Sequence, residues 1–311
     1  MNIVFFGTSE FAVPALEALI KAGYVQITVV TTPDKPAGRG LEIGSSPIKQ
    51  CVKDRWLLLM QPEKLDEAFL QKIRDLKPDV GVVAAYGKIL SKELIEIFPK
   101  GILNIHPSLL PKYRGASPIE FSILAGEENN TGVSIILIDE KMDHGPILSQ
   151  TRFRSVNNLT LVWNYSQLHD SLAKLSAELL IETLPEWLAG KIIPIPQDES
   201  EVTVTKIIKK EDGKIDWNQS AGYIERMTRA YEKWPGAYTL MENKILKIIK
   251  AEVVERNLTI QPGTVFEKEG FPAVACGELA VKLLIVKPEG KNEMPGDAYL
   301  RGHREILKSI L

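Results

Sequence analysis

Short, almost wholly apolar runs recur along the chain, and stretches with helical spacing separate them. The runs cover residues 2–8, 25–31, 80–85 and 101–105. Strands that are buried on both faces have this composition, and strands that alternate with helices pair as parallel sheets. The sequence therefore predicts an α/β fold whose core is a doubly wound, mostly parallel, Rossmann-like sheet.

The pattern changes after residue 189. Residues 190–206 have spaced prolines and then acidic residues, without helical periodicity, which is typical of a linker. Beyond them a helical stretch at 221–231 is followed by five strand candidates at 237–241, 245–251, 263–266, 273–276 and 280–287. Short strands of this kind form small barrels. We expect a first domain over 1–189, a linker over 190–206 and a smaller OB-like β-barrel domain over 207–311.

Bulk properties exclude several classes of protein. The 311 residues are 44% hydrophobic with a net charge of −2, so we expect a soluble protein that is not a general polyanion binder. No apolar run approaches the ~20 residues of a membrane helix, and no basic leader precedes the first run. Cys51 and Cys276 lie far apart without metal-ligand spacing. We therefore expect a cytoplasmic protein with reduced thiols and no metal.

Polar side chains appear where the run 101–105 ends. Asn104 and His106 are two residues apart, so they project from one face of a strand end. Ligands of open α/β sheets gather outside the carboxyl ends of the strands. This pair is a candidate catalytic site, and the structural alternative is a satisfied polar pair beside a turn.

Asp143 strengthens the catalytic interpretation, because it follows another strand-like run at 133–138. An amide, an imidazole and a carboxylate form a coherent set for acyl transfer, since they can hold a developing oxyanion and move a proton. No nucleophilic Ser or Cys accompanies them convincingly. The attacking group would then belong to the substrate.

Two further segments are candidates for binding. Residues 32–47 are rich in Gly and Pro and exceed the ~4–6 residues of an ordinary connection. They form either an irregular surface loop or a basic arm, in which Lys35 and Arg39 settle on a phosphate backbone or substrate. Tyr86 and Gly87 make a turn at the carboxyl end of the run 80–85 and face the same crevice as Asn104.

The residues from Asn104 to Gly115, with Met142, Asp143 and Gly145, resemble the folate-dependent formyltransferases. That resemblance implies a catalytic set of Asn104, His106 and Asp143 on a doubly wound fold. The branch of the family that acts on aminoacyl-tRNA is similar over further segments, at residues 6–12, 32–40, 209–217, 229–231, 234–237 and 299–302. The chain departs from that branch at Ser9 and at residues 232–234, outside the catalytic set.

The resemblance also implies the substrates and their contacts. The donor would be 10-formyltetrahydrofolate, and the acceptor would be the α-amine of methionine esterified to initiator tRNA. The implied folate contacts are Ser108, Leu109, Leu110, Pro111, Tyr86 and Gly87. The implied tRNA contacts are Arg39, Lys35, Lys206, Lys209 and Lys210. The expected state is a monomer.

Two alternatives remain open at the level of sequence. A sugar-nucleotide or other small-amine formyltransferase would share the catalytic set and the folate donor but would not need the Arg39 loop. A non-catalytic folate-binding or RNA-binding protein would bind without transferring a formyl group.

Overall fold

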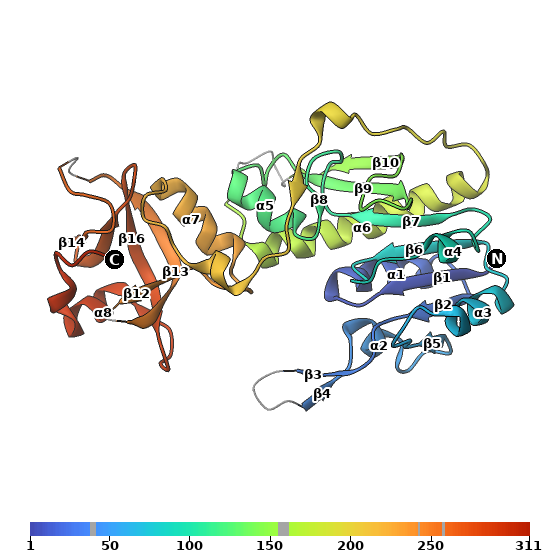
Figure 1. The fold of residues 1–311 in the computed structure, drawn as a ribbon, viewed down its shortest axis with the longest axis horizontal. Helices are drawn as coiled ribbons and strands as arrows, with labels where there is room; N and C mark the ends of the chain where they lie inside the picture. The colour runs from blue at the N-terminus through green and yellow to red at the C-terminus, as the bar shows by residue number, and fades with distance from the viewer. Residues whose placement is uncertain (38–41, 155–161, 242, 257–258) are drawn as a thin grey trace. The chain divides into compact units, whose positions relative to one another are not determined.

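The computed structural model describes residues 1–37, 42–154, 162–241, 243–256 and 259–311, and the chain divides into two compact units. Residues 1–118, 130–158 and 169–205 form the first unit. Residues 119–129, 159–168 and 206–311 form the second. Each unit contains a sheet of its own (Figure 1).

The first unit is built on a seven-stranded sheet with the order β10-β9-β7-β6-β1-β2-β5 (Figure 1). Strands β1, β2, β5, β6 and β7 are parallel to one another, and β9 and β10 add an antiparallel pair at one edge. This confirms the doubly wound, mostly parallel core. The strands are β1 Ile3–Gly7, β2 Ile27–Val30, β5 Leu58–Met60, β6 Val80–Ala84, β7 Ile102–His106, β9 Gly132–Leu137 and β10 Ile147–Arg152.

Helices cover the sheet and bury its apolar side chains. They are α1 Val13–Lys21 after the turn η1 Glu10–Ala12, α2 Pro47–Val52, α3 Glu67–Asp75, α4 Lys92–Ile95 and α6 Tyr165–Leu188. Phe6 and Val83 of the sheet share one core cluster with Leu70 of α3 and Leu94 of α4. Among the described residues, no helix combines the length and apolarity that a membrane span requires.

Three local features differ from the sequence prediction. The stretch 32–47 is not wholly irregular, because β3 Lys35–Ala37 and β4 Glu42–Gly44 pair as a short antiparallel hairpin. Ser91 is a typical N-cap, and the sequence predicts a helix from it to about Phe98, but α4 ends at Ile95 and the amides of Ile97 and Phe98 bond three residues back rather than four. The helical spacing of residues 159–189 predicts a long helix that is interrupted at Pro185 or restarts there, whereas α6 continues through Pro185.

The segment 190–206 is attached to the first unit at several points. Ile195 exchanges two main-chain hydrogen bonds with Ile147, each 2.8 or 2.9 Å long. Further along, β11 Val204–Thr205 pairs in parallel with the two-residue strand β8 Arg114–Gly115. The segment that we expected to be a linker therefore runs beside the turn that follows β7.

The second unit confirms the small antiparallel β-domain. Its sheet is a half-barrel with the order β12-β13-β16-β15-β14, and β17 pairs with β16. The strands are β12 Tyr238–Met241, β13 Lys244–Val254, β14 Val265–Lys268, β15 Phe271–Ala275, β16 Ala280–Pro288 and β17 Met294–Pro295. The remaining elements are α5 Pro118–Ala125, η3 Glu199–Glu201 of the first unit, η4 Lys210–Gly213, α7 Ala221–Ala230, α8 Gly296–Gly302 and η5 Arg304–Ile306.

Helix α7 is joined to the residues of the second unit that come from earlier in the chain. Arg229 forms an ion pair of 2.9 Å with the buried Glu128, and its guanidinium also donates to the main-chain oxygen of Trp163. Arg226 donates to the oxygen of Leu124 at 2.8 Å. These bonds explain why residues 119–129 and 162–168 belong with the C-terminal part of the chain.

Candidate active site

Strand β7 carries two of the three predicted catalytic side chains. Asn104 lies at the middle of the strand, and His106 is its last residue, with only 4% of its surface exposed. We expected the strand to end before His106, but pairing of His106 with Ser134 of β9 extends it. Because side chains alternate along a strand, Asn104 and His106 face the same side of the sheet.

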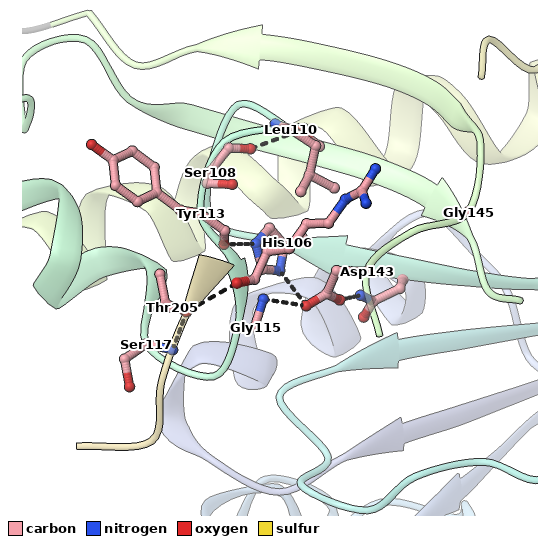
Figure 2. Close-up of polar contacts among 12 residues, drawn as sticks. His106, Ser108, Leu110, Tyr113, Gly115, Ser117, Asp143, Gly145 and Thr205 are labelled. Carbon is pink, nitrogen blue, oxygen red and sulfur yellow. Dashed lines mark hydrogen bonds and ion pairs between the residues drawn. The ribbon is translucent and has the colours of Figure 1, made fainter. Parts of the chain in front are cut away.

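Asp143 reaches this pair from the loop between β9 and β10 (Figure 2). Its Oδ1 accepts a hydrogen bond of 3.0 Å from Asn104 Nδ2, although 39 positions separate the two residues. Its Oδ2 lies 3.6 Å from His106 Nδ1, and 12% of the carboxylate side chain is exposed. The structure thus brings the three side chains together, while their chemical roles stay a prediction.

Main-chain atoms of the turn after β7 complete the cluster. The N–H of Gly115 donates to Asp143 Oδ2 at 2.9 Å, and His106 Nε2 lies 2.9 Å from the oxygen of Tyr113 (Figure 2). A carbonyl oxygen can only accept, so Nε2 carries the ring proton. The imidazole can therefore gain or lose a proton at Nδ1, the nitrogen that faces Asp143.

The predicted folate turn is held tightly from within. Ser108 is fully buried, and its hydroxyl donates to the oxygen of Lys112 at 2.6 Å. The amide of Leu110, whose side chain is buried, donates to Ser134 Oγ at 3.0 Å. Leu109 and Pro111 are half-buried. The side chains of Ser108 and Leu110 thus shape the turn, and only Leu109 and Pro111 present side-chain surface to a ligand.

Tyr86 does not present its side chain to a ligand. The ring is 2% exposed and packs edge-on against Phe6 in the core, which corrects the expectation that it faces the crevice. Burial raises the pKa of the Tyr86 hydroxyl to about 12. The ring lies in the core because residues of the sheet, α3 and α4 pack around it at the end of β6. Gly87 next to it is exposed, and the main-chain oxygen of Tyr86 accepts a hydrogen bond from the Thr8 hydroxyl.

The basic residues predicted to contact tRNA lie on both units. Lys35 is exposed on β3, while Arg39 lies outside the described residues. In the second unit Lys206 is paired with Asp212, and Lys209 and Lys210 are exposed.

Sequence reasoning missed two linked side chains, of which Gln197 contacts the cluster and Arg114 contacts Gln197. Arg114 is 7% exposed and donates through Nε to Gln197 Oε1 at 2.9 Å. Gln197 in turn donates to the main-chain oxygen of Asp143 at 2.8 Å. Arg114 belongs to the stretch that drew attention, but nothing in the expected linker distinguished Gln197. In the described part of the chain, no three His, Cys, Asp or Glu side chains gather as metal ligands.

Comparisons with known proteins agree with this geometry. A family model described as formyl transferase matches residues 1–184, and one described as formyl transferase, C-terminal domain, matches residues 207–304. A methionyl-tRNA formyltransferase of Chloroflexus aurantiacus is 48% identical over 305 residues, covering 97% of both chains. That of Caldanaerobacter subterraneus subsp. tengcongensis is 43% identical over 313 residues, covering 100% of both.

The solved structures include a protein that shares the fold at low sequence identity. An N-formyltransferase from Helicobacter canadensis, in complex with folinic acid and dTDP-3-aminofucose, superposes with a TM-score of 0.69 at 18% identity. It covers 91% of this chain and 98% of its own. At this identity the likeness shows a shared fold only.

Proposed function

The chain belongs to the formyl transferase family, and on that premise we propose that it transfers a formyl group to the α-amine of methionine on initiator tRNA. The donor in this proposal is 10-formyltetrahydrofolate. The observation that carries the proposal is the meeting of Asn104, His106 and Asp143 at the end of β7. In the reaction the amine nitrogen bonds to the formyl carbon, the bond from that carbon to the folate nitrogen breaks, and a proton passes from the amine to that nitrogen.

Asn104 and His106 would stabilise the oxyanion that forms when the amine attacks. One N–H of the Asn104 amide is engaged by Asp143, which leaves the second N–H for the substrate oxygen. His106 Nε2 is engaged by Tyr113, so the ring can donate to an oxyanion only from Nδ1 and only while it is doubly protonated. Removal of one such donor typically raises the barrier by ~3–4 kcal/mol.

Asp143 would orient the other two groups and help to move the proton. Each of its oxygens accepts one N–H, from Asn104 and from Gly115, so the carboxylate has a fixed direction. Its Oδ2 also faces His106 Nδ1 at 3.6 Å, close enough for a small movement or one water to connect them. In this proposal the amine loses its proton as the folate nitrogen that carried the formyl group gains one, and Asp143 and His106 would relay that proton.

Two neighbouring loops offer apolar surface that suits a flat ring of the donor. Ile89 follows the Gly87 turn and is 83% exposed, and Met142 precedes Asp143 and is 63% exposed. An ion pair of 2.9 Å between Lys92, the first residue of α4, and Glu140, two residues before Met142, brings the two segments together. We place the ring system of the folate against these side chains. Leu109 and Pro111 remain candidates for its contacts, with Ser108, Leu110 and Tyr86 supporting the walls.

The acceptor would be bound partly by basic residues outside the catalytic cluster. We propose Lys35 and Arg39 of the segment 32–47, and Lys206, Lys209 and Lys210 at the start of the second unit, as contacts to tRNA phosphates. In this proposal residues 1–189 carry the catalytic domain, and residues 207–311 carry a tRNA-binding domain reached through 190–206. The extensive similarity to relatives named for methionyl-tRNA supports this acceptor over an amino sugar.

The acceptor can be tested directly. Purified protein is incubated with 10-formyltetrahydrofolate and each of three acceptors: initiator tRNA charged with methionine, the same tRNA uncharged, and a dTDP-linked amino sugar. We expect N-formylmethionine on the charged tRNA and no product from the other two. Formylation of the sugar without formylation of the charged tRNA would replace our proposal with the small-amine alternative.

A further inference from the structure

We infer that Gln197, held by Arg114, is a positioning residue that fixes the Asp143 loop for catalysis. The inference rests on the function proposed above and adds a residue from the segment 190–206. Gln197 does not touch the substrate in this assignment. It acts through the main chain on both sides of His144.

The side-chain amide of Gln197 joins two carbonyl groups of the catalytic loop. Its Nε2 atom lies 2.8 Å from the oxygen of Asp143 and 2.8 Å from the oxygen of Gly145. An amide nitrogen has two hydrogens, so both bonds can form at once. The two ends of a three-residue turn are thereby tied to one group.

Arg114 determines which way the Gln197 amide points. Its Nε donates to Gln197 Oε1 at 2.9 Å, and a guanidinium has donors only. The oxygen of the amide must therefore face Arg114, and the nitrogen must face the loop. Arg114 is itself fixed, since it is 7% exposed and bonded to Glu199 at 2.8 and 3.3 Å. The same guanidinium holds the pKa of the Glu199 carboxyl below its usual range.

The loop has a geometry that needs an outside constraint. Asp143 has a φ of +50°, in the left-handed region that a residue with a side chain rarely adopts. At Gly145 an added Cβ would lie 1.8 Å from the oxygen of Leu137, so the main chain passes very close to β9. Asn104 and Gly115 hold the carboxylate group itself. Gln197 holds the main chain from which that carboxylate extends.

Attachment of the segment 190–206 does not explain these bonds. The segment is already held by the Ile147–Ile195 pair before Gln197 and by the β8–β11 pairing after it. Loss of the Gln197 amide would leave those contacts in place. Its particular effect would fall on the Asp143 loop.

The test compares Gln197→Ala with Asp198→Ala. Asp198 is the next residue, and its carboxylate bonds only to Ser200 among the described contacts, so this variant controls for a change in the segment. We expect Gln197→Ala to lower kcat by about 10- to 100-fold with both KM values within threefold, because a small displacement of a catalytic group has that effect. Asp198→Ala should keep the parent kcat, and both variants should unfold at similar temperatures.

A double variant separates positioning from general damage. In an Asp143→Ala background, Gln197→Ala should cause no further loss of kcat, because its effect passes through Asp143. Independent, additive losses would overturn the inference. If the parent and Gln197→Ala formylated charged tRNA equally well, the inference about Gln197 would also be overturned. The proposed function would then remain intact.

A measurement without turnover completes the test. Amide hydrogen exchange of residues 139–146 should be faster in Gln197→Ala than in the parent and unchanged in Asp198→Ala. Equal exchange in all three proteins would refute the inference, whether or not the parent formylates tRNA. Failure of the parent to formylate tRNA would count against the proposed function instead.

Discussion

The Nε2 atom of His106 lies 2.9 Å from the main-chain oxygen of Tyr113, seven residues further along the chain. This contact places the ring proton on Nε2 and directs Nδ1 toward Asp143. The orientation of the imidazole is therefore set by the turn that follows β7. It also restricts His106 to one reactive nitrogen.

Replacement of His106 by Ala tests that nitrogen. We expect the single-turnover rate of formyl transfer to fall by about 10²- to 10³-fold, because one donor to the oxyanion is lost. Binding of charged tRNA and of the folate donor, measured separately at equilibrium, should change little. A rate within fivefold of the parent would show that His106 is not in contact with the oxyanion.

Asp143→Asn keeps the shape of the side chain but removes its charge and one acceptor. One atom of the new amide would present N–H groups to Asn104 or to Gly115, which are themselves donors. We expect kcat to fall by about 10²- to 10⁴-fold. Steady-state kinetics with charged tRNA decide the matter, and a loss of only a few-fold would remove the carboxylate from the mechanism.

Arg39→Ala should weaken the use of tRNA without changing the use of the donor. We expect KM for charged tRNA to rise about 10-fold, equivalent to ~1.4 kcal/mol of binding, and the salt dependence of binding to fall by about one ion. Lys53→Ala is the matched control, since Lys53 is an exposed cation of the first unit with no proposed role. Equal effects of the two variants would count against a specific contact at Arg39.

Gly115→Ala should disturb both stability and activity. Gly115 has a φ of +114°, and an added Cβ would lie 2.4 Å from the oxygen of Thr205, so the β8–β11 contact must move. The strained backbone alone costs about 1–3 kcal/mol. Displacement of the Gly115 N–H from Asp143 should also lower kcat.

Gly23→Ala separates those two effects. Gly23 also has a positive φ, of +86°, but no atom lies within 4 Å of its added Cβ. This variant should lose stability in thermal unfolding and retain the parent kcat. If Gly115→Ala likewise retained full kcat, the N–H of Gly115 would have no part in orienting Asp143.

Glu120 of helix α5 predicts a pH dependence of stability. Burial raises the pKa of its carboxyl from 4.5 to about 7. Between these values the native state binds more protons than the unfolded state, so stability falls as pH rises through the window from about 4.5 to about 7. The contribution is at most about 3 kcal/mol.

Glu120→Gln should remove that contribution, because a neutral amide does not titrate. Denaturant unfolding at pH 5, 6, 7 and 8 gives the free energy of unfolding of both proteins. We expect the free energy of unfolding of the parent to fall relative to that of the variant as pH rises. This difference should become constant above about pH 7. A difference that is independent of pH would mean that Glu120 titrates normally.

Much of the fold could be predicted from the sequence, because local composition decided where strands and helices form. The apolar run 80–85 became the central strand β6, since a strand buried on both faces has no polar positions. The five strand candidates after residue 236 all correspond to strands of the second unit. Errors occurred at ends, as in α4, where non-local packing decides how far a weak helix extends.

Only part of the candidate site could be predicted from the sequence. The residue types at Asn104, His106 and Asp143 suggested acyl transfer, because such groups can hold a developing oxyanion and move a proton. The buried position of Tyr86 was not foreseeable from a turn at a strand end, since the surrounding core is assembled from α3, α4 and four strands. The contacts of the Tyr113 main-chain oxygen and the Gly115 N–H could not be predicted either, because the identity of a side chain does not show what its main-chain groups bond to.

By itself, the sequence determined which strands and helices form and which chemical groups stand at their ends, because periodicity and side-chain chemistry are local properties. Tertiary structure decided which nitrogen of His106 is free, how Asp143 is oriented and that Gln197 reaches its loop. These are contacts between segments far apart in the chain, and hydrogen bonds of about 3 Å depend on the packing of the whole unit.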